Sequence, residues 1–323
     1  MPGPPTGFAT VCCAPMSTHT RPAFPVQRRR VREGGARAFW RLGEGGFPLL
    51  LVHGFPETKR IWARNLAPLA AAGFDVIAPD LRGVGDSDRA PDAFHDPPAY
   101  ARDLHALCEV VGIERCGAVA GDVGAMVVAE LGLRFPGFVV RQCLFNTLAP
   151  PLPAAYAEAG IPDDPPPERR PEMDYFVRQA GDADGLLAEL DTPERRRDYV
   201  ASMYTHRLWA AAGAFTAEDV TYHSEPFADA SALRAAVAVY EVGAGRRPLS
   251  EMPLLAQVNP VPTLILYGPA DAVVTRHFPD RMAVAFPEHA GPFTVPGAGH
   301  FLQWEQPAVL HGALRAFFRD LLD

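Results

Sequence analysis

Apolar and polar positions alternate along the chain in a way that predicts strands separated by helices. Short apolar runs typical of buried strands lie at residues 36–42, 48–52, 75–78, 116–120 and 139–144. Apolar residues at helical spacing lie between them, at 62–72, 98–111 and 125–135. Strands that alternate with helices predict an α/β fold with a mostly parallel sheet covered by helices on both faces.

The pattern changes after Pro150 and Pro151. Residues 151–255 contain Pro-rich connections and amphipathic helical runs, but no convincing parallel strand. Strand patterns return at 262–267 and 291–295, and a final helix is expected at 308–322. We therefore expect four segments, which are a flexible leader at 1–25, an α/β core at 26–150, an inserted helical cap at 151–255 and the rest of the core at 256–323.

Composition and charge exclude several classes of partner. The chain has 323 residues, of which 48% are hydrophobic, enough for a sizeable core, and its net charge is −8. This charge and the lack of a basic stripe argue against a nucleic-acid partner. No run of about 18 apolar residues predicts a membrane span. Five cysteines, an odd number at spacings that fit no metal site, are typical of a reduced, cytoplasmic protein.

The most informative segment is Ala118–Met126, which reads Ala-Val-Ala-Gly-Asp-Val-Gly-Ala-Met. A short apolar strand is followed by a small-x-Asp-x-Gly turn and then by a helical run. This is the nucleophile-elbow pattern with Asp122 where a serine hydrolase has serine. A carboxylate, with a reference pKa of about 3.9, is already an anionic nucleophile at neutral pH. Such a nucleophile forms an alkyl ester, so epoxides or alkyl halides are the expected substrates.

Two further segments place candidate catalytic residues at strand ends. Asp271 follows the strand at 262–267, at the sheet edge where ligands of open α/β sheets bind. His300 follows the next strand within a run of small residues, Pro296-Gly297-Ala298-Gly299. The order nucleophile, acid, histidine is that of the α/β-hydrolase triad. His300 would activate water to hydrolyse the ester, and Asp271 would orient the imidazole.

The segment His53-Gly54-Phe55-Pro56-Glu57 directly follows the strand at 49–52. Glycine and proline there fix a turn that can aim a backbone N–H outward. The N–H groups of Phe55 and Val123 would then form an oxyanion hole. We expect His53 to be structural rather than a base.

Together, several motifs resemble those of soluble epoxide hydrolases with the α/β-hydrolase fold over about residues 30–323. The motifs are His53-Gly54-Phe55-Pro56-Glu57, Asp80-Leu-Arg-Gly-Val-Gly-Asp-Ser87, the Asp122 elbow, Gly268-x-x-Asp271 and Gly299-His300-Phe301-x-Gln303-x-Glu305-x-Pro307. The resemblance implies an enzyme that converts a small-molecule epoxide and water into a vicinal diol, without a metal or organic cofactor. It also implies that Glu57 and Glu305 bond to loops, and that Arg82 and Asp86 fix the loop after Asp80.

In this family two cap tyrosines protonate the epoxide oxygen. The resemblance points to Tyr175, in Asp174-Tyr175-Phe176-Val177-Arg178-Gln179, and to Tyr240, in Ala236-Val-Ala-Val-Tyr-Glu. A phenol with a pKa of about 10 can donate to a forming alkoxide at neutral pH. Three other tyrosines stay open as alternatives: Tyr199, Tyr204 and Tyr222.

The sequence departs from related families after the nucleophile. Haloalkane dehalogenases use a tryptophan at the position of Val123 to hold the halide. Fluoroacetate dehalogenases share His-Gly-Phe-Pro but carry arginines just after the nucleophile, where this chain has apolar Met126–Val128. Dehalogenation is therefore the second hypothesis, and a non-catalytic binding protein with a hydrolase fold is the third.

The sequence also suggests an apolar substrate pocket that would favour aryl or alkyl epoxides. Its candidate residues, which core packing would explain equally well, are Phe55, Trp62, Met126, Trp209 and Phe227. The sequence does not choose between a monomer and a homodimer.

Overall fold

The structure, a computed structural model, describes residues 24–31, 35–206 and 208–322. Over these ranges eight strands form one sheet in the order β1-β2-β4-β3-β5-β6-β7-β8. The first two pairings, β1 with β2 and β2 with β4, are antiparallel, and all others are parallel. The strands are β1 (Gln27–Val31), β2 (Gly35–Leu42), β3 (Phe47–Val52), β4 (Phe74–Pro79), β5 (Cys116–Gly121), β6 (Val139–Phe145), β7 (Thr263–Tyr267) and β8 (His289–Thr294).

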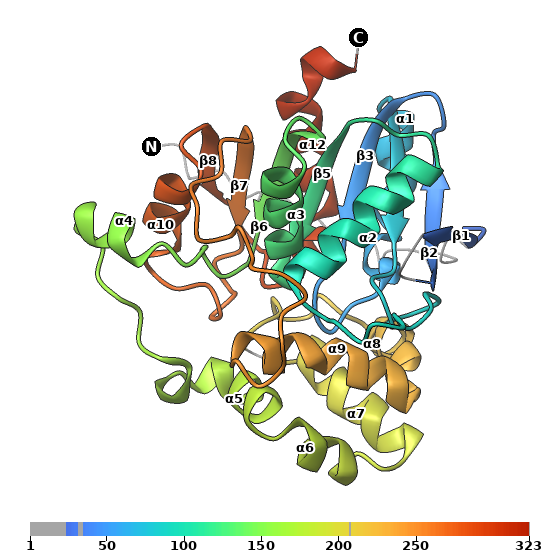
Figure 1. The fold of residues 1–323 in the computed structure, drawn as a ribbon, viewed down its shortest axis with the longest axis vertical. Helices are drawn as coiled ribbons and strands as arrows, with labels where there is room; N and C mark the ends of the chain where they lie inside the picture. Colours follow the sequence, from blue (N-terminus) through green and yellow to red (C-terminus); the bar gives the residue numbers. More distant parts are fainter. Residues whose placement is uncertain (1–23, 32–34, 207, 323) are drawn as a thin grey trace, which may run out of the picture.

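Helices cover both faces of the sheet because its central strands are apolar on both sides. In β3, Leu49 and Leu51 face one core cluster, whereas Leu50 and Val52 face the other. The first cluster packs against α1 (Leu66–Ala71) and α12 (Pro307–Phe317), and the second against α2 (Pro97–Val110), α3 (Asp122–Arg134) and α10 (Phe278–Ala285). Figure 1 shows α2, α3 and α10 on the near face of the sheet.

A helical block separates β6 from β7. It contains α4 (Pro153–Glu158), η2 (Pro167–Arg169), η3 (Pro171–Met173), α5 (Asp174–Gly181), α6 (Ala183–Glu189), α7 (Pro193–Tyr204), α8 (Ala217–Ser224), η4 (Glu225–Ala228) and α9 (Ala230–Gly243). In Figure 1, α5 to α9 gather at one end of the sheet, whereas α4 lies beside α10. Within the described ranges, no helix has both the length and the apolar character needed to cross a membrane.

The predicted elements differ from the observed ones at a few places. The helix expected at 62–72 is split into η1 (Lys59–Trp62) and α1. Pro68 has no N–H and its ring clashes with a carbonyl one turn earlier, so a helix can hold it only in the first turn. The strand β1 was not predicted, because the sequence Gln-Arg-Arg-Arg-Val has no apolar alternation; charged side chains are typical of an edge strand.

The expected helix at 308–322 ends at Phe317 and continues as the short η5 (Arg319–Leu321). The expected leader at 1–25 lies outside the described residues except for its last two. Of these, Phe24 packs its ring 5.2 Å from the ring of Trp40.

Candidate active site

Asp122 lies at the tight turn where β5 ends and α3 begins. Its φ of 49° is in the left-handed region, which costs a residue with a Cβ about 1–3 kcal/mol. The turn also needs a glycine at position 124, where a Cβ would lie 2.6 Å from the carbonyl oxygen of His53. This strained turn lifts the Asp122 side chain out at the carboxyl edge of the sheet, as a nucleophile elbow does.

A backbone N–H and a side-chain hydroxyl hold Asp122 from two sides. The N–H of Phe55 donates to Asp122 Oδ1 over 2.7 Å, and Gly54 is so close that a Cβ there would lie 2.6 Å from the Asp122 Cβ. Thr147 Oγ1 donates to the Asp122 carbonyl over 2.8 Å. Val123 is the second residue of α3, so its N–H has no acceptor within the helix and is available to a ligand.

His300 lies between two carboxylates. Its Nδ1 is 2.8 Å from Asp271 Oδ2, and its Nε2 is 3.5 Å from Asp122 Oδ2. Burial would lower the pKa of the imidazole, but the charges and hydrogen bonds of Asp271 and Asp122 outweigh it and raise the pKa well above its ordinary value. The structure thus brings together the three residues that the sequence selected from three strand ends.

Asn146, which sequence reasoning missed, connects the elements that carry the acid and the histidine. Its Nδ2 donates to Asp271 Oδ2 over 2.8 Å and to the Gly299 carbonyl over 3.0 Å. Its Oδ1 accepts from the N–H of Gly268 over 3.1 Å, and the residue is fully buried. Its only sequence signal is its place directly after the strand β6, a position with no motif of its own.

Three other ionisable residues bond to loops, as the sequence suggests. His53 Nε2 accepts from the N–H of Leu81 over 3.0 Å, and burial lowers the pKa of its imidazole. Glu57 accepts from the N–H of Gly54 over 2.6 Å and from Gln303 Nε2 over 2.7 Å. Glu305 accepts from three N–H groups, those of Ala211, Gly299 and Phe301.

The loop after Asp80 is held in a similar way by charged side chains. Arg82 pairs with Asp92 and Asp103, and Asp86 pairs with Lys59.

The two selected tyrosines come from different helices of the block and meet near Asp122. Tyr175 of α5 and Tyr240 of α9 have ring centroids 5.8 Å apart. Burial raises the pKa of both phenols well above its ordinary value; Tyr175 and Asp122 raise that of Tyr240 further, and Asp122 that of Tyr175. Phe55 contacts both rings, with its centroid 6.4 Å from Tyr175 and 5.1 Å from Tyr240. The phenols are therefore neutral donors at neutral pH.

Trp209 connects the helical block to the histidine loop. Its ring lies 4.7 Å from that of Tyr175, and its carbonyl accepts from the N–H of His300 over 2.5 Å. Its indole Nε1 donates to the Glu172 carbonyl over 3.1 Å. Trp209 thus touches a candidate acid through its side chain and the candidate base through its backbone.

Of the other proposed pocket residues, two lie in the core and one lines a separate cavity. Trp62 and Phe227 are completely buried, with the Trp62 ring 6.3 Å from that of Phe145. Met126 of α3 lines a small apolar cavity together with Thr147 and Leu148. Their part in substrate binding stays a prediction.

The alternative tyrosines are engaged elsewhere. Tyr199 accepts from Gln179 over 2.9 Å, Tyr204 donates to the Pro56 carbonyl over 2.5 Å, and Tyr222 lies under the guanidinium of Arg60.

Known proteins resemble the chain in sequence and fold. Residues 48–307 match the model of the α/β hydrolase fold. Epoxide hydrolase A of Mycobacterium tuberculosis is 30% identical over 312 residues, which cover 86% of this chain and 92% of the relative.

Solved structures of other proteins share the fold of this chain. The structure of the epoxide hydrolase CorEH without ligand has a TM-score of 0.77 at 21% identity and covers 92% of this chain and 99% of its own. Epoxide hydrolase A of Mycobacterium thermoresistibile has a TM-score of 0.71 at 25% identity, and the match covers 91% of this chain and 98% of that structure's chain. These matches confirm the fold that the sequence predicts.

Proposed function

Because the chain belongs to the α/β-hydrolase family, among its epoxide hydrolase-like members, we propose that it hydrolyses an epoxide to a vicinal diol through an ester of Asp122. The observation that carries this proposal is the arrangement around one carboxylate. Asp122 Oδ1 is held by the N–H of Phe55, and Asp122 Oδ2 faces His300. Two neutral phenols complete the site from the helical block, which we propose acts as a cap at residues 151–255.

Ring opening forms the ester. Asp122 Oδ2 attacks an epoxide carbon, the bond from that carbon to the ring oxygen breaks, and the alkoxide takes a proton from Tyr175 or Tyr240. Attack at carbon displaces the ring oxygen from the side opposite the nucleophile, so the acid must come from the cap. Such proton transfer contributes typically 10²–10⁴-fold to a rate.

Hydrolysis of the ester needs the base. Formation of the ester removes the charge of Asp122, one of the two carboxylates that raise the pKa of His300. The pKa of the imidazole then falls, so a larger fraction of His300 is in the neutral form that can accept a proton at the step that requires a base. His300 takes a proton from water, the water oxygen attacks the Asp122 Cγ, and the oxyanion lies in the hole formed by the N–H groups of Phe55 and Val123. Collapse breaks the bond between Cγ and Oδ2, and the departing diol oxygen takes the proton back from His300. The second proton of the water, left on the new Asp122 carboxyl, returns to the tyrosinate and restores the resting site.

A single turnover in heavy-oxygen water tests the covalent route. The first diol should be unlabelled, because one oxygen comes from the epoxide and the other from Asp122, and the label should appear in the Asp122 carboxylate. Label in the first diol would mean direct attack by water and would refute the ester. The D122N variant is the matched control and should take up no label.

Dehalogenation remains the second candidate, because an aspartate nucleophile and a water-activating histidine also serve an alkyl halide. The test compares styrene oxide, a trans-disubstituted epoxide and a bromoalkane with the same purified protein. Turnover of the bromoalkane alone would favour the dehalogenase. A protein that forms no covalent adduct with any of the three would be the non-catalytic binding module.

A further inference from the structure

The loop that follows β7 and carries Asp271 is held by residues of the helical block. Arg170, which lies between η2 and η3, donates from Nη2 to the carbonyls of Ala272 over 3.2 Å and Val273 over 2.7 Å. The Leu208 carbonyl, between α7 and α8, accepts from the N–H of Ala272 over 2.8 Å. The backbone directly after the candidate acid is therefore bonded to the helical block through both a donor and its acceptors.

Hydrogen bonds continue from this loop to the candidate base. The N–H of Val273 donates to Asp271 Oδ1 over 2.9 Å, and Asp271 Oδ2 lies 2.8 Å from His300 Nδ1. The carboxylate that orients the imidazole is thus bonded to the same residue that accepts from Arg170. A displacement of Val273 would therefore move the candidate acid relative to the candidate base, and the orientation of the imidazole by the acid decides how well the base works.

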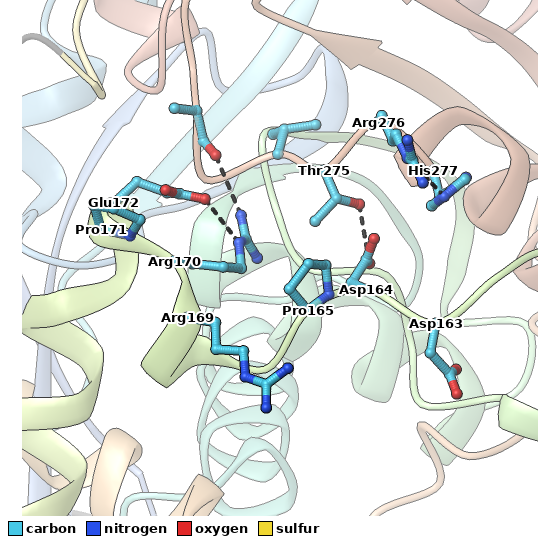
Figure 2. A pocket seen from close by; sticks show the side chains of 12 residues that line it. Asp163, Asp164, Pro165, Arg169, Arg170, Pro171, Glu172, Thr275, Arg276 and His277 are labelled. Atoms are coloured by element: carbon cyan, nitrogen blue, oxygen red, sulfur yellow. Dashed lines mark hydrogen bonds and ion pairs between the residues drawn. The ribbon is translucent and has the colours of Figure 1, made fainter.

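The guanidinium of Arg170 has a second anchor within the helical block. Its Nε donates to Glu172 Oε1 over 2.8 Å, and its side chain is 10% exposed. A guanidinium is planar and carries its donors in a fixed fork, so a bond at Nε also limits the direction of Nη2. Figure 2 shows Arg170 bonded to Glu172 and to the loop after β7, whereas the neighbouring Arg169 points away from both.

The groups of the ring-opening step have other supports. The N–H of Phe55 and Thr147 Oγ1 bond to Asp122, and the ring of Phe55 contacts both candidate phenols of the helical block. Phe55 and Thr147 follow the strands β3 and β6, so neither belongs to the loop after β7. Movement of that loop should therefore disturb the base that hydrolyses the ester more than the groups that form the ester.

We propose that Arg170 is a positioning residue for ester hydrolysis, which holds Asp271, and through it His300, from the helical block. This proposal rests on the proposed function, because it takes His300 as the base that hydrolyses the Asp122 ester. Hydrogen bonds from a charged donor are about twice as strong as bonds between neutral groups. Without the bonds from Arg170 the loop can shift, and a displacement of about 1 Å at a reacting group can cost about 10²-fold in rate.

A single turnover with styrene oxide, quenched at intervals and analysed by mass spectrometry, measures formation and decay of the ester separately. R170A should slow ester decay about tenfold and leave ester formation unchanged. R170K should recover part of the decay rate, because lysine keeps the charge but lacks the fork. Methylguanidinium should also restore decay in R170A, because Arg170 lines a pocket of about 520 Å³ that can admit a small cation.

Two controls separate positioning from general attachment of the helical block. R169A removes an exposed arginine of the same pocket. T275V removes the bond of 3.0 Å from Thr275 Oγ1 to Asp164, which joins the same two segments farther along the chain from the acid. Both variants should keep ester decay within about twofold of the wild type. Unchanged decay in R170A, an equal slowing of ester formation in R170A, or equally slow decay in T275V would overturn the proposal.

Proton magnetic resonance separates this proposal from the proposed function, because it needs no epoxide. The proton between His300 Nδ1 and Asp271 should give a low-field resonance, assigned by its absence in H300Q. R170A should shift this resonance, and R169A should leave it in place. A shift in a protein that forms no ester would support positioning of the acid and the base by Arg170 and refute the proposed activity. Ester turnover in which R170A matches the wild type, in both the resonance and the ester decay, would refute the positioning role and leave the activity standing.

Discussion

The carboxylate of Glu57 predicts a specific dependence of stability on pH. Burial raises its pKa from 4.5 to about 7, and Asp122 adds to the rise, while the N–H of Gly54, His300 and Gln303 partly oppose it. Between these two pH values Glu57 is ionised in the unfolded chain but protonated in the folded protein. The folded state therefore binds the additional proton, and the free energy of unfolding falls as the pH rises through this window.

The magnitude follows from the two pKa values. Each pKa unit corresponds to about 1.4 kcal/mol, so ionisation of Glu57 removes roughly 3 kcal/mol of stability between pH 4.5 and pH 7.5. The variant E57Q has no group to ionise at this position and lacks this loss. The free energy of unfolding of E57Q minus that of the wild type should therefore increase by this amount from pH 4.5 to pH 7.5. A constant difference in stability caused by the amide itself does not alter this change.

Urea unfolding followed by circular dichroism at pH 4.5, 5.5, 6.5 and 7.5 measures this difference. The control is E114Q at an exposed glutamate, which should follow the wild type at every pH. A difference between the wild type and E57Q that stays constant from pH 4.5 to 7.5 would refute the reasoning, because Glu57 would then titrate alike in the folded and unfolded states.

Four further predictions concern the reaction. H300Q should still form the ester but fail to hydrolyse it, so mass spectrometry should show the protein plus one epoxide; normal turnover would refute the assignment. Single Y175F and Y240F changes should slow adduct formation in part, and the double change should slow it about 10²–10⁴-fold with unchanged circular dichroism; a double variant at the parental rate would mean other donors. N146A should lower kcat and shift its pH profile, since Asp271 loses a donor, whereas a loss confined to thermal stability would mean a purely structural role. G124A should cost about 10²-fold in kcat/KM, because a Cβ 2.6 Å from the His53 carbonyl must displace the elbow; wild-type kinetics would contradict this.

The sequence predicts those parts of the molecule that depend on local pattern. The apolar runs identify seven of the strands, and the small residues around Asp122 identify the elbow, because both follow from contacts between near neighbours along the chain. Asp122, Asp271 and His300 each follow a strand of one parallel sheet, so they are expected at the same sheet edge, where the carboxyl ends of its parallel strands lie.

Other parts of the site depend on contacts that no local pattern records. Asn146 binds groups 122, 125 and 153 positions away, and an isolated asparagine after a strand has no distinguishing spacing. The charged strand β1 was missed for a related reason, because its pairing with β2 rather than burial of its side chains defines it.

Trp209 contacts both the helical block and the α/β core, and this limits how independently the sequences of these two parts can change. Its ring packs on Tyr175, whereas its carbonyl accepts from the N–H of His300. One residue therefore contacts both the acid that we propose for ring opening and the base that we propose for ester hydrolysis. A helical block transplanted from a relative would need to supply that carbonyl at the same position, or the histidine loop would lose an anchor. When the whole helical block is exchanged, the hydrolysis step that releases the diol should therefore be lost more often than the binding of a new epoxide. Chimeras in which the exchanged segment ends before Trp209, so that residues 209–211 stay with the α/β core, should preserve turnover.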